Sequence, residues 1–151
     1  MLWTTRGLNQ QGEHDVQIEQ KLWTEDTGWK ALQKGETDSE FQLVLAFGGT
    51  EIFKAGSLLA EVVDMYPGAI VAGCSTAGEI HNVDVTDDTL TVTAIAFDNT
   101  RVASASVCTC DVENSYQAGK TLAAKLNSEG LVHVFVLSDG LAVNGSDLAK
   151  G

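Results

Sequence analysis

The most constraining feature of the sequence is a strand, helix, strand pattern that begins at residue 41. Residues 41–47 form a near-continuous apolar run, as expected for a buried strand, and a Gly-Gly-Thr turn follows at once. Thr50 is a suitable N-cap, and apolar residues then recur at helical spacing until Pro67 ends the helix. Residues 69–74 form a second buried strand. The pattern predicts a parallel strand pair joined by a right-handed crossover.

Four further segments extend this prediction. Residues 90–97 and 101–107 are expected to form an antiparallel hairpin, one face of which mixes hydroxyl and apolar residues and should lie under another element or a partner. Asn114 begins a capping box for a helix, and residues 131–137 are the most apolar strand of the chain. The predicted fold is α/β, with a mixed, largely parallel sheet, an antiparallel hairpin and flanking helices.

The two ends of the chain are less regular. We expect residues 1–40, which are polar with three tryptophans as anchors, to form an arm that packs on the core, with a short helix near residues 27–34. Residues 41–151 form the α/β domain. Because Ser146 has the character of an N-cap and the chain stops a few residues later, we expect an incomplete domain, truncated at its C-terminal end.

Charge and cysteine content exclude several classes of partner. The net charge is −12, and the nine lysines and arginines form no basic stripe, which argues against nucleic acid and anionic membranes. No apolar run reaches the roughly 20 residues needed to span a bilayer, and the N-terminus lacks a signal-peptide pattern. Three cysteines in a chain of this size favour a reducing compartment. We therefore predict a cytoplasmic protein.

Polar residues gather in the loops after three predicted strands. In an open α/β sheet, ligands bind beyond the carboxyl ends of parallel strands, where such loops converge. The candidate ligand-binding residues in these loops are Gly49, Thr50, Gly73, Cys74, Ser75, Thr76, Gly78, Glu79, Asp139, Gly140 and Asn144.

This set of residues suits a small zwitterion. Backbone amides with Ser75 and Thr76 are able to hold a carboxylate, while Asp139 or Glu79 is able to hold an ammonium group. The alternative interpretation is structural: the glycines make tight turns and the hydroxyl groups cap helices.

Enzyme and metal chemistry fit the sequence less well. The segment around Ser75 has one residue too many for the Gly-x-Ser-x-Gly elbow of a serine hydrolase, and Cys74 is better explained as a buried apolar residue. The Gly-Gly-Thr turn ending at Thr50 lacks the lysine of a phosphate-binding loop. Cys108 and Cys110 lack a second pair to complete a zinc site. We expect no catalytic residue and no bound metal, and the sequence identifies no cofactor.

Several motifs together resemble the FIST N-terminal domain. They occur in family order over roughly residues 40–151, and the most specific is the octapeptide Gly-Cys-Ser-Thr-Ala-Gly-Glu-Ile at residues 73–80. The others are residues 45–47, the strand ending at Phe97, residues 137–140, and Asn144 with Gly145.

The resemblance implies a function that composition does not reveal. FIST domains occur in intracellular signal-transduction proteins, so it implies a sensory domain for small ligands, with amino acids as the usual proposal. It also implies a following C-terminal FIST domain and signalling output modules. Two alternatives stay open: a haem-based nitric oxide sensor, for which His14, His81 and His133 are the available ligands, and an assembly module that forms a homodimer or docks a partner domain.

Overall fold

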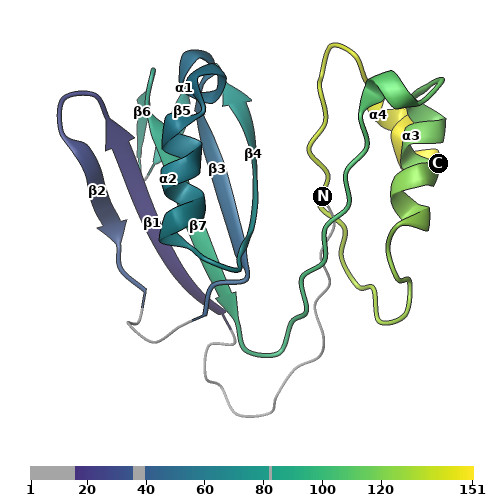
Figure 1. The fold of residues 1–151 in the computed structure, drawn as a ribbon, viewed down its shortest axis with the longest axis horizontal. Helices are drawn as coiled ribbons and strands as arrows, with labels where there is room; N and C mark the ends of the chain where they lie inside the picture. The colour runs from purple at the N-terminus through teal and green to yellow at the C-terminus, as the bar shows by residue number, and fades with distance from the viewer. Residues whose placement is uncertain (1–15, 36–39, 82) are drawn as a thin grey trace. The chain divides into compact units, whose positions relative to one another are not determined.

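The computed structural model describes residues 16–35, 40–81 and 83–151. These residues belong to two compact units, of which the first ends at Asp98 and the second begins at Asn99. Figure 1 shows the sheet of the first unit and the helices α3 and α4 of the second. No helix within the described ranges is long and apolar enough to cross a membrane.

The first unit is built on a five-stranded sheet in the order β2-β1-β7-β3-β4. β3 and β4 are parallel, as predicted, and the other neighbouring strands are antiparallel. The α/β class with a mixed sheet is therefore confirmed, although one strand pair alone is parallel among the described residues. The strands are β1 (Val16–Thr24), β2 (Gly28–Gln33), β3 (Leu43–Gly49), β4 (Ile70–Thr76) and β7 (Leu90–Phe97).

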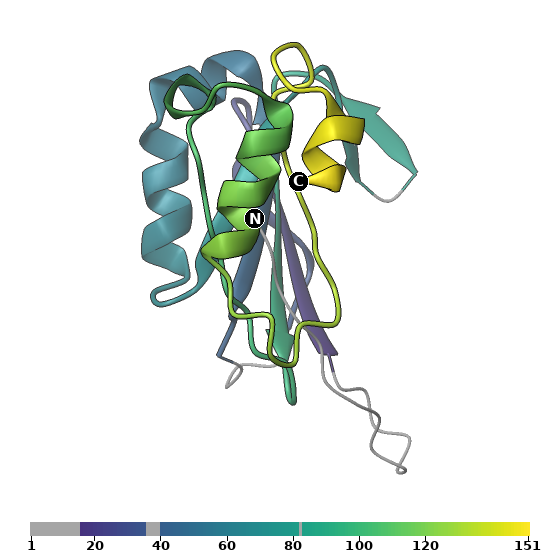
Figure 2. The same ribbon diagram turned by 90° about the vertical axis from the view of Figure 1, so that its right-hand side faces the viewer.

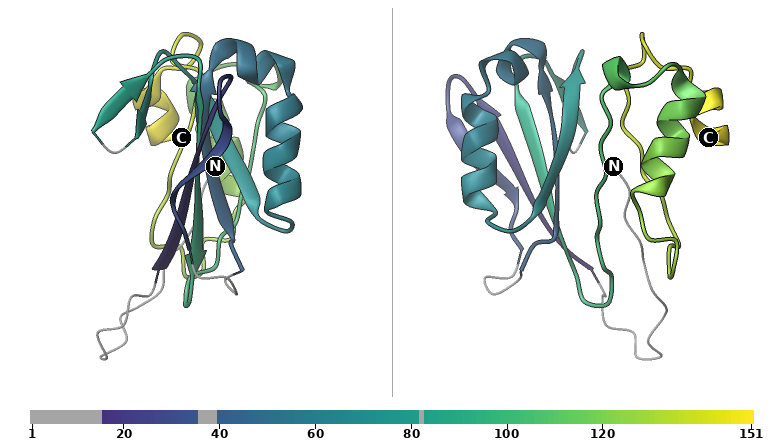
Figure 3. Two further views of the ribbon diagram at one scale, coloured as in Figure 1. Left: turned by 90° about the vertical axis from the view of Figure 1, so that its left-hand side faces the viewer. Right: turned by 45° about the vertical axis from the view of Figure 1, so that its right-hand side comes forward.

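Helices α1 (Thr50–Ala55) and α2 (Ser57–Met65) cover one face of this sheet (Figure 3, left). Val44 lies opposite Ala94 and Ala46 lies opposite Val92, so β3 and β7 present these apolar residues on the face toward α2. Burial of this face supplies most of the apolar contact that holds the unit together. The buried core cluster comprises Val44, Ala46, Leu58, Val62, Tyr66, Leu90, Val92 and Ala94.

The predicted continuous helix is broken at one residue. Gly56 has a φ of 72°, a left-handed conformation that favours glycine, and its amide donates to the carbonyl oxygen of Ile52. This cap ends α1 and lets α2 start in a new direction. α2 then ends at Met65, just before Pro67, as the sequence indicates. Thr50 is the first helical residue of α1, and the N-cap position belongs to Gly49.

The N-terminal segment differs from its prediction. Residues 28–33, where a short helix was expected, form β2, and β1 pairs with β7 along eight register positions from Val16 to Trp23. The described part of this segment is therefore part of the sheet. Its tryptophans Trp23 and Trp29 pack against the core cluster, whereas Trp3 and His14 lie outside the described residues.

The predicted hairpin of residues 90–97 with residues 101–107 is wrong. β7 has β1 along one edge and β3 along the other, so no edge is left for a further strand. Residues 101–107 and the predicted strand at residues 131–137 are in no regular strand. A hairpin that was not predicted is formed by β5 (Glu79–His81) and β6 (Asp84–Thr86). It lies in the segment between β4 and β7, where a loop was expected.

In the second unit, α3 (Ser115–Ala124) and α4 (Gly145–Lys150) lie side by side (Figure 2). The predicted cap of α3 is confirmed, because the Asn114 side chain accepts a hydrogen bond from the amide of Gln117 at 2.9 Å. α4 is capped by Asn144 rather than by Ser146. A short 3₁₀ turn, η1 (Thr109–Asp111), precedes α3.

Candidate functional site

The carboxyl ends of β3 and β4 bring several predicted residues together. The last paired positions of the two strands are Gly49 and Thr76, which are register partners. β5 begins shortly after β4 and places Glu79 against this edge. Because parallel strands end at the same edge of the sheet, Thr76 at the end of β4 lies beside Gly49, where β3 leads into α1.

Glu79 is the centre of this edge, and its side chain is only 1% exposed. One carboxylate oxygen, Oε1, accepts a hydrogen bond from the Thr76 hydroxyl at 2.5 Å. The other, Oε2, accepts from the Thr89 amide at 3.1 Å and from the Thr89 hydroxyl at 2.8 Å. Thr86 shares a hydrogen bond of 2.9 Å with Thr89. We call these four residues, Thr76, Glu79, Thr86 and Thr89, the Glu79 clasp.

The Glu79 clasp joins three elements. It ties the end of β4 and the β5–β6 hairpin to the residue that precedes β7, and the Gly49 amide donates to the Thr89 carbonyl oxygen at 3.0 Å. A buried carboxylate requires several donors to offset its loss of hydration, and these three donors meet that need. The first role of Glu79 is therefore to hold the edge in shape, and its oxygens are already occupied.

Two of the predicted glycines are explained by packing. A Cβ atom on Gly73 would overlap the carbonyl oxygen of Ala46 on the neighbouring strand, and one on Gly49 would lie 3.2 Å from the Cα and a carboxylate oxygen of Asp88. Gly78 is less crowded, with the nearest atoms of Asp87 and Val85 at 3.3 Å from such a Cβ. These glycines therefore allow backbone segments to approach one another closely.

Other predicted residues remain accessible at the same edge. Thr50 and Ser75 are exposed, and Cys74 is a half-buried free thiol. Ser75 precedes Thr76 at the end of β4, and side chains alternate along a strand, so Ser75 points away from the face on which Thr76 meets Glu79. The hydroxyl groups of Thr50 and Ser75 are accessible polar groups that this edge offers to a ligand.

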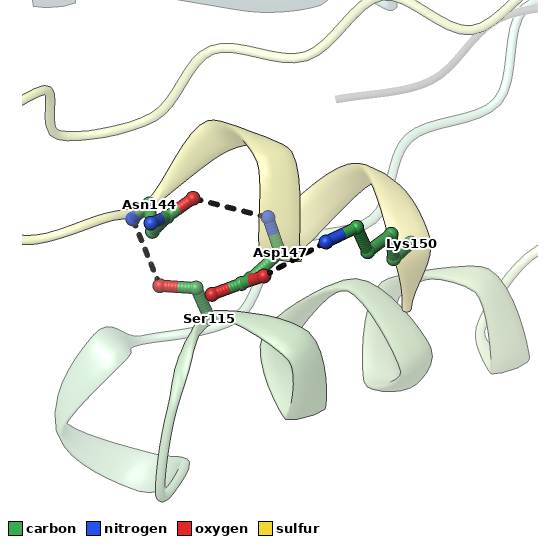
Figure 4. A network of polar contacts seen from close by, with 4 residues as sticks. All are labelled: Ser115, Asn144, Asp147 and Lys150. Carbon is green, nitrogen blue, oxygen red and sulfur yellow. Dashed lines mark hydrogen bonds and ion pairs between the residues drawn. The ribbon is translucent and has the colours of Figure 1, made fainter.

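The remaining three predicted residues belong to the second unit, where they shape a turn and a helix cap. The Asp139 carboxylate accepts hydrogen bonds from the amides of Leu141 and Ala142 at 2.8 and 3.3 Å. Gly140 lies in open space. Asn144 caps α4 through the Asp147 amide, and its own amide donates to Ser115 (Figure 4). Asp139 and Asn144 thus have structural roles, in a turn and in a helix cap.

Two residues near the edge, Thr89 and His81, were not among the predicted ligand-binding residues, although His81 was one of the possible haem ligands. Thr89 supplies two of the three donors to Glu79, but an isolated threonine before a strand carries no sequence signal for such a role. His81 is 8% exposed, and neither ring nitrogen has a hydrogen-bond partner among the described residues. Glu79 and His81 are two residues apart and therefore lie on the same face of β5, and this spacing is the sequence signal that indicates His81.

A second polar cluster lies at the opposite end of the same sheet. The Glu19 carboxylate accepts from Lys21 and from the Tyr66 hydroxyl, both at 2.6 Å, beside a cavity of about 600 Å³. Burial raises the pKa of Glu19, but hydrogen bonds from Lys21 and Tyr66 and the charge of Lys21 outweigh it, so the pKa is lowered. Burial and the Glu19 carboxylate raise the pKa of Tyr66.

The fold and the edge together define an α/β domain whose polar loops follow a parallel strand pair. Comparison with protein families matches the FIST N domain to residues 42–151, and the chain belongs to this family. FIST domains are generally sensory domains of signal transduction and are not known as catalytic. No curated protein and no solved structure matched the chain.

Proposed function

We propose that this chain binds a small ligand, with an amino acid as the favoured class, as the sensory part of an intracellular signalling protein. The domain acts by binding and carries out no chemical step. Ligand binding at the edge formed by β3 and β4 is passed on to the C-terminal FIST domain and output modules of the signalling protein.

The observation that carries this proposal is a strand edge that is held in shape by the Glu79 clasp and that also exposes two hydroxyl groups. Ser75 and Thr50 lie at the ends of two strands whose geometry is held by the buried Glu79 carboxylate. A binding site on rigid elements loses little ordering entropy when it takes a ligand. The hydroxyl groups suit the carboxylate of an amino acid, because they donate hydrogen bonds and carry no charge of their own.

The same clasp offers a route for the signal. A ligand that moves the end of β4 by a small distance acts directly on the Thr76 to Glu79 hydrogen bond, and through Glu79 on the β5–β6 hairpin. A response of this kind requires the hairpin to adopt two arrangements. The ligand must then bind the chain more tightly in one arrangement than in the other. The hairpin is therefore the element that reports occupancy.

A thermal-shift screen against the twenty amino acids tests the proposal. At about 100 times its dissociation constant, a ligand stabilises the folded chain by about 2.7 kcal/mol, which raises the melting temperature by several degrees. We expect one amino acid class to give this shift, and Ser75→Ala to weaken its binding about tenfold, because a hydrogen bond to a charged group is lost. Ser104→Ala, an exposed serine of the second unit, is the matched control and should leave binding unchanged.

The same samples separate the proposal from its two alternatives. No shift with any amino acid would contradict the proposal, and a haem absorption band on adding haem would then favour the nitric oxide sensor. An assembly module is favoured by one observation: the β5–β6 hairpin exposes Ile80, Val83 and Val85 at 73%, 95% and 68%. Dimerisation that depends on concentration but not on ligand, measured by sedimentation velocity, would support that role.

A further inference from the structure

The turn before α3 gathers three metal-binding side chains. Cys108, Cys110 and Asp111 are all exposed, and their ligand atoms lie within 4.8 Å of one another. On a strand, Cys108 and Cys110 would share one face while Asp111 pointed to the other. The chain instead turns through η1 (Thr109–Asp111), so the carboxylate of Asp111 joins the two sulfur atoms. The turn thus supplies a third donor that the sequence pattern alone does not indicate.

Local contacts hold the three side chains of this cluster together. The Cys110 amide donates to Cys108 Sγ at 3.3 Å, and Cys110 Sγ lies 3.6 Å from Asp111 Oδ1. The chain also carries a net charge of −12, which attracts cations to its surface.

We propose that the reduced chain binds a zinc-class divalent metal ion through Cys108, Cys110 and Asp111. Two thiolates and a carboxylate match the donors that Zn²⁺ accepts, whereas Mg²⁺ and Ca²⁺ require oxygen donors. Three protein ligands leave the fourth tetrahedral position to water. The site is therefore an open one from which the ion exchanges readily. It lies in the second unit and is independent of the ligand function proposed for β3 and β4.

Cys108 and Cys110 form a disulfide in the structure, so metal binding requires its reduction. Two equivalents of a thiol reductant convert the disulfide to two thiols and are themselves joined as a disulfide. The ion then displaces one proton from each thiol, and two protons are released for each metal bound. Two sulfur atoms bound to one tetrahedral ion by bonds of about 2.3 Å lie about 3.8 Å apart. Because both side chains are exposed, rotation about χ1 separates them without disturbing packed atoms.

Cobalt and zinc titrations of the reduced full chain test this site. After reduction with a phosphine, which is then removed without oxygen, Co²⁺ should produce the near-ultraviolet band of thiolate-to-cobalt charge transfer, saturating at one equivalent. Zn²⁺ should abolish the band and protect two thiols from a thiol-specific reagent. Its affinity, measured by competition with a chromophoric chelator, should rise with pH because protons are released.

Matched variants identify the ligands. Cys108→Ser and Cys110→Ser should each remove the charge-transfer band and weaken Zn²⁺ binding at least 100-fold, and Asp111→Asn should weaken it about tenfold. Cys74→Ser, which changes the half-buried free thiol, should bind like the unmodified chain. Circular dichroism checks that each variant is folded. A band that survives in the Cys108→Ser, Cys110→Ser double variant, or zinc affinity equal in that variant and the unmodified chain, would overturn the proposal.

Discussion

At the scale of single residues, Glu79 is the side chain on which the edge of the sheet most depends. Glu79→Ala removes the acceptor for the Thr89 amide and for two hydroxyl groups. A buried amide without a partner costs about 1–3 kcal/mol, so we expect the free energy of unfolding to fall by about 3 kcal/mol in total. Glu79→Gln should cost about 1 kcal/mol, because its amide oxygen still accepts from Thr89 while its NH₂ group donates to Thr76. Urea unfolding measures both values.

Glu51→Gln is the control for this experiment. Glu51 pairs with Lys54 on the exposed surface of α1, and exposed ion pairs contribute little. We expect a change within about 0.5 kcal/mol. If Glu79→Ala and Glu51→Gln lowered the free energy of unfolding equally, the Glu79 clasp would not be what holds the edge.

Glu19 should make the free energy of unfolding depend on pH. Its carboxylate accepts from Lys21, Tyr66 and the Gly35 backbone, so Glu19→Gln should lower the free energy of unfolding at neutral pH by about 1 kcal/mol. The lowered pKa means that this contribution is present above the ordinary value of 4.5 and is lost as the pH falls through the folded-state pKa. The difference between the two chains should therefore shrink from about pH 6 to about pH 3. Urea unfolding across this range would contradict the assignment if the difference stayed constant.

At the scale of elements, the parallel pair β3 and β4 depends on Gly73. A methyl group at this position would overlap the Ala46 carbonyl oxygen, which is backbone and has no room to move. Gly73→Ala should therefore separate the strands and cost about 3 kcal/mol or more, or prevent folding. Gly145→Ala, at a position with open space around it, should change stability by less than about 1 kcal/mol. Thermal unfolding compares the two, and an unchanged midpoint for Gly73→Ala would contradict this packing.

Elements were predictable where the local pattern was strong. β3, β4, β7 and the cap of α3 follow from apolar runs, alternation and a capping residue, all of which act over a few residues. Residues 101–107 have an equally clear alternation but form no regular strand. A strand needs a neighbour for its backbone, and β1 occupies the edge of β7 that the hairpin required. The pairing of β1 with β7 joins residues far apart in the chain, and no local pattern encodes it.

At the scale of the whole molecule, the predicted binding loops are divided between two units. Residues from Gly49 to Glu79 belong to the first unit, and Asp139, Gly140 and Asn144 belong to the second. Within the first unit, the parallel strand ends bring Gly49, Thr76 and Glu79 together as the sequence predicts. That the whole set forms one ligand site stays a prediction.

The sequence by itself determined the α/β class, the crossover of β3 and β4, and membership of the FIST N domain family, because these follow from local periodicity and contiguous motifs. Only the tertiary structure decided that Glu79 is buried with both carboxylate oxygens hydrogen-bonded, since Thr89 is brought to it by the pairing of β7 with β3. It also decided that Asp111 joins Cys108 and Cys110, because that grouping requires the turn through η1, which the sequence pattern does not indicate. Burial and strand partners depend on contacts between distant residues, and such contacts exist only in the folded chain.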